Sequence, residues 1–77
     1  MVYVYSKKDC GPCVLVKNEL ERRGLKKGID WEEKDIEKNE LYMKELTDLG
    51  FMSVPLVTKD SEVLFNGFRP DIMAQVL

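Results

Sequence analysis

The stretch Cys10-Gly11-Pro12-Cys13 decides how the rest of this chain is interpreted. It holds the only two cysteines of the sequence, and two residues separate them. An apolar run at residues 2–5 precedes it, and a helical pattern begins at Pro12. A Cys-x-x-Cys sequence between a strand and a helix is typical of a redox-active dithiol. We therefore expect Cys10 and Cys13 to alternate between two thiols and a disulfide.

Two other uses of the same cysteines remain open, a structural disulfide and a metal site. A bridge that closes a loop of about four residues would stabilise the fold by roughly 2 kcal/mol, near the low end for disulfides. A structural staple gains more from a long loop, so this spacing favours redox chemistry over stapling. A metal site would need ligands from a second chain or from outside, because the sequence supplies two thiolates and no histidine.

The composition limits the class of protein. With 77 residues the chain has room for one domain, and its 44% hydrophobic and 34% charged residues fit a globular protein. The net charge of -2, from 12 basic and 14 acidic residues, gives no basic footprint for nucleic acid. No apolar run approaches the roughly 20 residues of a membrane span, and we find no secretory leader. We therefore expect a cytoplasmic protein, in a compartment where thiols are kept reduced.

Strand and helix patterns alternate along the sequence. Strands are predicted at residues 2–6, 29–36, 54–58 and 62–66, and helices at residues 12–23, at 39–49 and from residue 70 onward. Asn39 suits the N-cap of the second helix, and Gly50 follows its end. The order β-α-β-α-β-β-α predicts an α/β fold, a four-stranded mixed sheet that starts parallel, ends in a hairpin and carries three helices on its faces.

The position of the dithiol at a helix start predicts different roles for its two cysteines. Unpaired N–H groups and the positive end of the helix dipole favour a thiolate at Cys10, so we expect a lowered pKa there. The charge of Lys8 adds to this effect. Cys13 shares the buried face of the helix, so we expect Cys10 to attack the substrate disulfide and Cys13 to resolve the mixed disulfide. Pro12 stiffens the turn between them, and Gly11 leaves the approach to Cys10 open.

A more distant segment, Ser53-Val54-Pro55, is similar to the cis-proline loop of the thioredoxin superfamily. The chain as a whole resembles the glutaredoxin-like branch of that superfamily. This resemblance implies a single glutaredoxin-like domain over residues 1–77 with the thioredoxin/glutaredoxin fold. It also implies that Pro55 follows a cis peptide bond and faces the dithiol, and that the backbone before it pairs with a partner peptide.

Two segments narrow the resemblance. Gly50-Phe51-Met52-Ser53-Val54-Pro55, followed by Gly67-Phe68-Arg69-Pro70-Asp71, looks like the NrdH redoxins, small electron donors to class Ib ribonucleotide reductases. The resemblance implies a monomer without a bound cofactor, which receives electrons from NADPH through thioredoxin reductase and reduces a protein disulfide, such as that of ribonucleotide reductase. It implies that Arg69 and Asp71 form a structural network joining their loop to the second helix. The partner-binding residues are then expected to be Lys8, Ser53, Val54, Pro55, Gly67 and Phe68.

Four positions depart from the patterns of the related families. The Gly-Pro pair between the cysteines is typical of thioredoxins, yet Asp9 stands where thioredoxins have tryptophan and Val4 where they hold a buried acid. Two alternatives therefore stay open. One is a glutathione-dependent glutaredoxin, although such proteins carry a Gly-Gly-Cys/Ser-Asp type segment where this chain has Gly67-Phe68-Arg69. The other is a metal or iron–sulfur carrier formed by a dimer.

Overall fold

The strands and helices follow one another in the predicted order β-α-β-α-β-β-α. The computed structural model describes all residues, 1–77. The elements are β1 (Val2–Ser6), α1 (Gly11–Arg22), β2 (Trp31–Asp35), α2 (Glu40–Asp48), β3 (Leu56–Lys59), β4 (Glu62–Asn66) and α3 (Pro70–Val76). None of the three helices combines the length and the apolar character that a membrane crossing requires.

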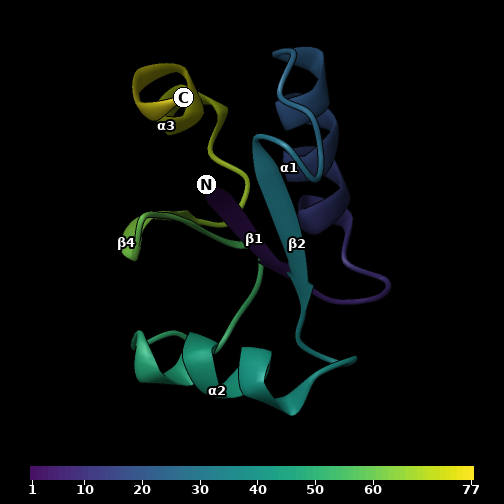
Figure 1. The fold of residues 1–77 in the computed structure, drawn as a ribbon, viewed down its shortest axis with the longest axis vertical. Helices are drawn as coiled ribbons and strands as arrows, with labels where there is room; N and C mark the ends of the chain where they lie inside the picture. Colours follow the sequence, from purple (N-terminus) through teal and green to yellow (C-terminus); the bar gives the residue numbers. More distant parts are fainter.

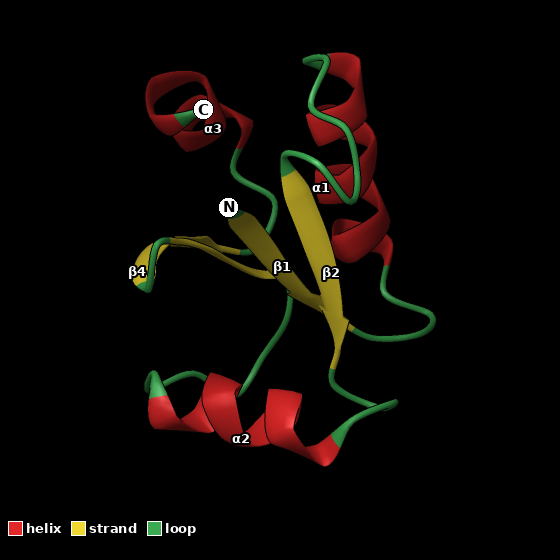
Figure 2. Ribbon diagram, viewed as in Figure 1, coloured by secondary structure: helices red, strands yellow, loops and turns green.

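The four strands form one mixed sheet in the order β2-β1-β3-β4. Strand β1 pairs in parallel with β2 and antiparallel with β3, and β3 and β4 form the antiparallel hairpin. Helices α1 and α3 cover one face of the sheet and α2 covers the other (Figures 1 and 2). The predicted four-stranded sheet of the thioredoxin/glutaredoxin fold is thereby confirmed.

Each face of the sheet carries its own hydrophobic cluster, because side chains alternate along a strand. We call the first the α1-face cluster; its buried members are Val2, Val4, Val16, Leu20, Trp31, Val57, Phe65 and Met73. We call the second the α2-face cluster; its buried members are Tyr5, Ile36, Leu46 and Leu56. Strands β1 and β3 contribute to both clusters, so the strand that leads into the dithiol is anchored on both faces of the sheet.

Local sequence signals set the helix ends. The Asn39 Oδ1 accepts a hydrogen bond from the Leu41 N–H at 2.9 Å, which caps α2 as predicted. Beyond the other end of α2, Gly50 takes a φ of +91°, a conformation open mainly to glycine. The end of α2 and the loop that follows are thereby determined by short-range chemistry.

Two strands begin later than predicted. Strand β2 starts at Trp31 rather than at residue 29, because the preceding residues form a turn in which the Asp30 carboxylate accepts the Lys26 N–H at 2.8 Å. Ile29 lies in that turn and is 70% exposed. Strand β3 starts at Leu56 rather than at residue 54, because the hairpin register ends where Leu56 pairs with Asn66.

Candidate active site

The two cysteines form a disulfide at the start of α1, with their Cα atoms 5.2 Å apart. Cys10 is the N-cap residue, in an extended conformation, and Cys13 lies in the first helical turn. The Cys10 Sγ accepts a hydrogen bond from the Cys13 backbone N–H at 3.3 Å. A sulfur at an N-cap meets the unpaired N–H groups of the helix, which stabilise negative charge.

The two sulfurs are not equally accessible. Cys10 retains 8% exposure, whereas Cys13 has none. Gly11 and Pro12 between them are exposed, and a Cβ built on Gly11 would meet no atom within 4 Å. A partner can therefore approach the dithiol from the side of Cys10 and Gly11.

The loop that leads to Cys10 is held by a contact with the segment that follows β2. The Lys8 backbone N–H donates to Glu37 Oε1 at 2.9 Å, whereas the Lys8 side chain is exposed. The next residue, Asp9, adopts a φ of 55°, which is uncommon for a residue other than glycine. Lys8 thus lies two residues from Cys10 with its ammonium in solvent.

The Ser53–Pro55 loop is fastened to the end of β4. The Val54–Pro55 peptide bond is cis, as the resemblance implied, and Pro55 is buried. The Gly67 N–H donates to the Pro55 carbonyl at 2.8 Å. The Asn66 Nδ2 donates to the Ser53 carbonyl at 3.0 Å, and the Ser53 hydroxyl donates to Asn66 Oδ1 at 3.3 Å. The structure therefore brings Ser53, Val54 and Pro55 together with Gly67, and it adds Asn66, which no local sequence signal indicates.

The segment after Gly67 differs in part from expectation. Phe68 is half-buried and packs against the α1-face cluster. Arg69 pairs with Asp71 at 3.1 Å, and neither side chain makes a hydrogen bond or ion pair with α2. The expected network between this loop and the second helix is thus wrong for these contacts, because α2 covers the opposite face of the sheet (Figure 1).

A polar network between α1 and the sheet was not predicted. Glu33 on β2 accepts hydrogen bonds from the buried Ser6 hydroxyl at 2.5 Å, from Lys17 Nζ at 2.8 Å and from Lys27 Nζ at 3.2 Å. Burial raises the pKa of Glu33, but the hydrogen bonds from Lys17, Ser6 and Lys27 outweigh burial and bring the pKa down to about 2. Glu33 pairs in the sheet with Val4, so a carboxylate lies on the strand beside the position where thioredoxins hold their acid.

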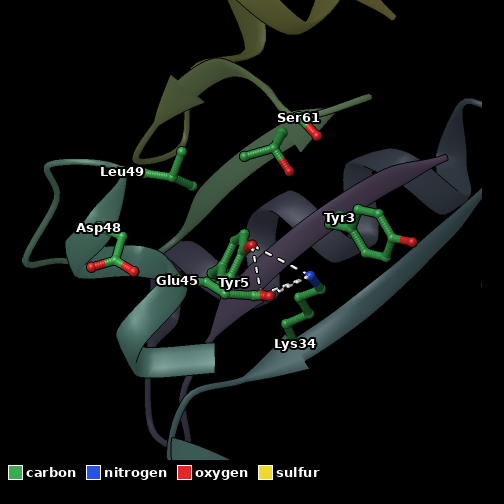
Figure 3. A pocket seen from close by; sticks show the side chains of 8 residues that line it. Tyr3, Tyr5, Lys34, Glu45, Asp48, Leu49 and Ser61 are labelled. Carbon is green, nitrogen blue, oxygen red and sulfur yellow. Dashed lines mark hydrogen bonds and ion pairs between the residues drawn. The ribbon is translucent and has the colours of Figure 1, made fainter. Parts of the chain in front are cut away.

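A cavity of about 310 Å³ opens on the α2 face (Figure 3). Lys34 lines it, with Nζ 4.3 Å from the centroid of the Tyr3 ring and 2.7 Å from the Glu45 carboxylate. The Tyr5 hydroxyl also donates to Glu45 at 3.0 Å. Burial, and to a smaller extent this hydrogen bond, raises the pKa of Tyr5. The Lys34 ammonium already has carboxylate and aromatic partners, and none of the predicted site residues lines the cavity. We therefore assign it a structural role.

The ligand-type side chains of a single chain do not form a metal site by themselves. No group of three or more His, Cys, Asp or Glu residues lies close enough together to hold a metal ion. A site on Cys10 and Cys13 would need its remaining ligands from elsewhere.

Comparison with known proteins agrees with the geometry. Residues 2–64 match the glutaredoxin family model. The chain is 34% identical to the glutaredoxin-like protein NrdH of Lactococcus lactis subsp. lactis over 99% of both chains. The crystal structure of a thioredoxin-like protein is similar with a TM-score of 0.85 and 33% identity over 100% of both chains. The structure of NrdH-redoxin from Escherichia coli is similar with a TM-score of 0.82 and 26% identity, over 99% of this chain and 93% of that one. The chain therefore belongs to the glutaredoxin family, as a glutaredoxin-like protein of the NrdH type whose adjacent cysteine pair is that of a thiol-disulfide oxidoreductase.

Proposed function

We propose that the protein reduces protein disulfides, with Cys10 as the nucleophile and Cys13 as the resolving thiol. The observation that carries this assignment is the difference between the two sulfurs at the start of α1. Cys10 is the N-cap residue and retains 8% exposure, whereas Cys13 is fully buried. A thiolate at the accessible position can reach a partner's disulfide, and the buried thiol can reach only Cys10.

The reaction transfers two electrons in two exchange steps. The Cys10 thiolate attacks one sulfur of the substrate disulfide, forms a mixed disulfide and releases the other substrate sulfur as a thiolate. The Cys13 thiolate then attacks Cys10 Sγ, which forms the intramolecular disulfide and releases the second substrate thiolate. The substrate is reduced to a dithiol, and the protein is left in the disulfide form that the structure describes.

The partner-binding surface is proposed to surround the dithiol. It would consist of Lys8, Ser53, Val54, Pro55, Gly67 and Phe68. The Val54 backbone N–H and carbonyl make no hydrogen bond within the chain, so they are free to pair with an extended peptide. Lys8 adds an exposed positive charge near Cys10.

The electron source is proposed to be NADPH through thioredoxin reductase, and the substrate the disulfide of a ribonucleotide reductase in the cytoplasm. Two observations support this choice over glutathione. The segment Gly67-Phe68-Arg69 replaces the Gly-Gly-Cys/Ser-Asp type segment that binds the glutathione carboxylate in glutathione-dependent glutaredoxins. The E. coli NrdH-redoxin is described as a glutaredoxin-like protein with a thioredoxin-like activity profile.

Parallel NADPH-linked assays test the reductant. The oxidised protein is supplied with thioredoxin reductase in one assay and with glutathione plus glutathione reductase in the other, and a disulfide substrate is added to both. We expect NADPH consumption with thioredoxin reductase and little with glutathione. The reverse pattern would make the protein a glutathione-dependent glutaredoxin.

A trapping experiment tests the two roles. The variant Cys13→Ser should accumulate a mixed disulfide with the substrate through Cys10, visible by mass spectrometry and lost on reduction. The matched variant Cys10→Ser should accumulate none, because its remaining sulfur is buried. A trap that forms through Cys13 instead would reverse the assignment.

A further inference from the structure

The loop between α2 and β3 has few backbone anchors. Its first anchor is the Phe51 N–H, which donates to the Leu46 carbonyl at 3.2 Å, and its last is the Pro55 carbonyl, which accepts from Gly67. Between them, Met52, Ser53 and Val54 make no backbone–backbone hydrogen bond. Something other than backbone pairing must hold the middle of this loop in place.

The Asn66 side chain makes the hydrogen bonds to that middle portion. Its backbone is fixed, because Asn66 is the last residue of β4 and pairs with Leu56 in the sheet. Its amide donates through Nδ2 to the Ser53 carbonyl and accepts through Oδ1 from the Ser53 hydroxyl. The donor and the acceptor of one amide therefore bind the carbonyl and the hydroxyl of Ser53, which an acceptor-only carboxylate could not do.

The bond to the Ser53 carbonyl also holds the peptide group that joins Ser53 to Val54. Asn66 occupies the Ser53 carbonyl, whereas the N–H and carbonyl of Val54, directly before Pro55, stay unpaired. A peptide that pairs with Val54 needs this group held at a fixed position and orientation, because ordering a mobile loop on binding costs affinity. Asn66 makes no hydrogen bond to either cysteine, so we give it no direct part in the exchange of sulfur bonds.

We infer that Asn66 is a positioning residue for the partner-binding loop, which sets the affinity for protein disulfides without altering the reactivity of the dithiol. This inference rests on the proposed reduction of protein disulfides. It predicts that a substrate with a polypeptide chain to bind depends on Asn66, whereas a small disulfide that contacts only the dithiol does not.

The test compares Asn66→Ala with wild type in single-turnover oxidation of the reduced protein by insulin and by dithiobis(nitrobenzoate). For insulin, the half-saturating concentration should rise about three- to tenfold at unchanged maximal rate, as expected for losing one or two partly exposed hydrogen bonds. The rate with dithiobis(nitrobenzoate) should stay within about twofold of wild type. The variant Asn66→Asp should be at least as impaired with insulin, because its carboxylate cannot donate to the Ser53 carbonyl.

Two further variants keep the experiment decisive. Glu62→Gln, an exposed change on the same strand, should behave as wild type with both substrates. Ser53→Ala removes the weaker of the two hydrogen bonds at an exposed position and should raise the insulin value about twofold, even if Asn66→Ala folds poorly. Equal slowing of both substrates, or no change with insulin, would overturn the inference. A wild-type protein that reduces neither substrate would overturn the proposed function itself.

Discussion

The Glu33 network should make folding stability depend on pH in a way that one substitution removes. The perturbation is Glu33→Gln, which deletes the carboxylate that Ser6, Lys17 and Lys27 share. The pKa of Glu33 falls from its ordinary 4.5 to about 2 in the folded protein. At 1.36 kcal/mol for each unit of pKa, this corresponds to about 3 kcal/mol as an upper value. Glu33 is 20% exposed, so screening reduces the expected contribution to about 2 kcal/mol.

The sign follows from the lowered pKa. A carboxylate with a lower pKa in the folded state stabilises the protein fully above its unfolded-state pKa of 4.5, and the stabilisation is lost as the pH falls towards 2. The free energy of unfolding of wild type should therefore exceed that of Glu33→Gln by about 2 kcal/mol at neutral pH. By about pH 3 the difference should be less than half as large.

Urea denaturation of the oxidised protein between pH 3 and pH 7 measures this difference. Trp31 is the only tryptophan and is 1% exposed, so its fluorescence reports unfolding. The control is Glu32→Gln, the neighbouring exposed residue, which removes the same charge without an ion pair to break. A difference of equal size at pH 7 and pH 3, or the same behaviour in the control, would refute the reasoning.

Three further predictions concern the α2 face. Leu46→Ala should lower the free energy of unfolding by about 2–5 kcal/mol in urea, because Leu46 is fully buried; a loss below about 1 kcal/mol would contradict its place in the core. Asn39→Ala should cost about 1 kcal/mol by removing the bond to the Leu41 N–H, and Asn39→Asp should restore most of it. Lys34→Met should cost about 1 kcal/mol at low salt and less at high salt, because Glu45 is 41% exposed; a loss that does not change with salt would show that packing, not charge, holds Lys34.

Short-range signals explain why so much of the fold could be predicted. The helix that carries Cys13 has its Pro at the start and its apolar residues three and four apart, and α2 has Asn39 before it and Gly50 after it. Such signals act within a few residues, so the helix ends can be predicted from the local sequence alone. The dithiol could be located for the same reason, because its motif and its helix are adjacent.

The remaining parts of the site depend on contacts between distant residues. The network of Glu33 joins residues 6, 17, 27 and 33, and the bonds of Asn66 cross 13 residues. Neither set has a characteristic spacing, because the register of the sheet and not the local sequence brings the partners together. The expected link from Arg69 and Asp71 to α2 is absent for a different reason, because the two side chains pair with each other, two residues apart.

The order of the strands leaves two sheet edges, β2 and β4, and the chain protects them unequally. Every residue of β2 after Trp31 is charged, and charges along an edge discourage other strands from pairing with it. Strand β4 carries a single charge, on Glu62, and its Val63 is 38% exposed. The charges that make β2 hard to recognise as a strand thus guard against aggregation. Strand β4 is therefore the edge that lacks this protection.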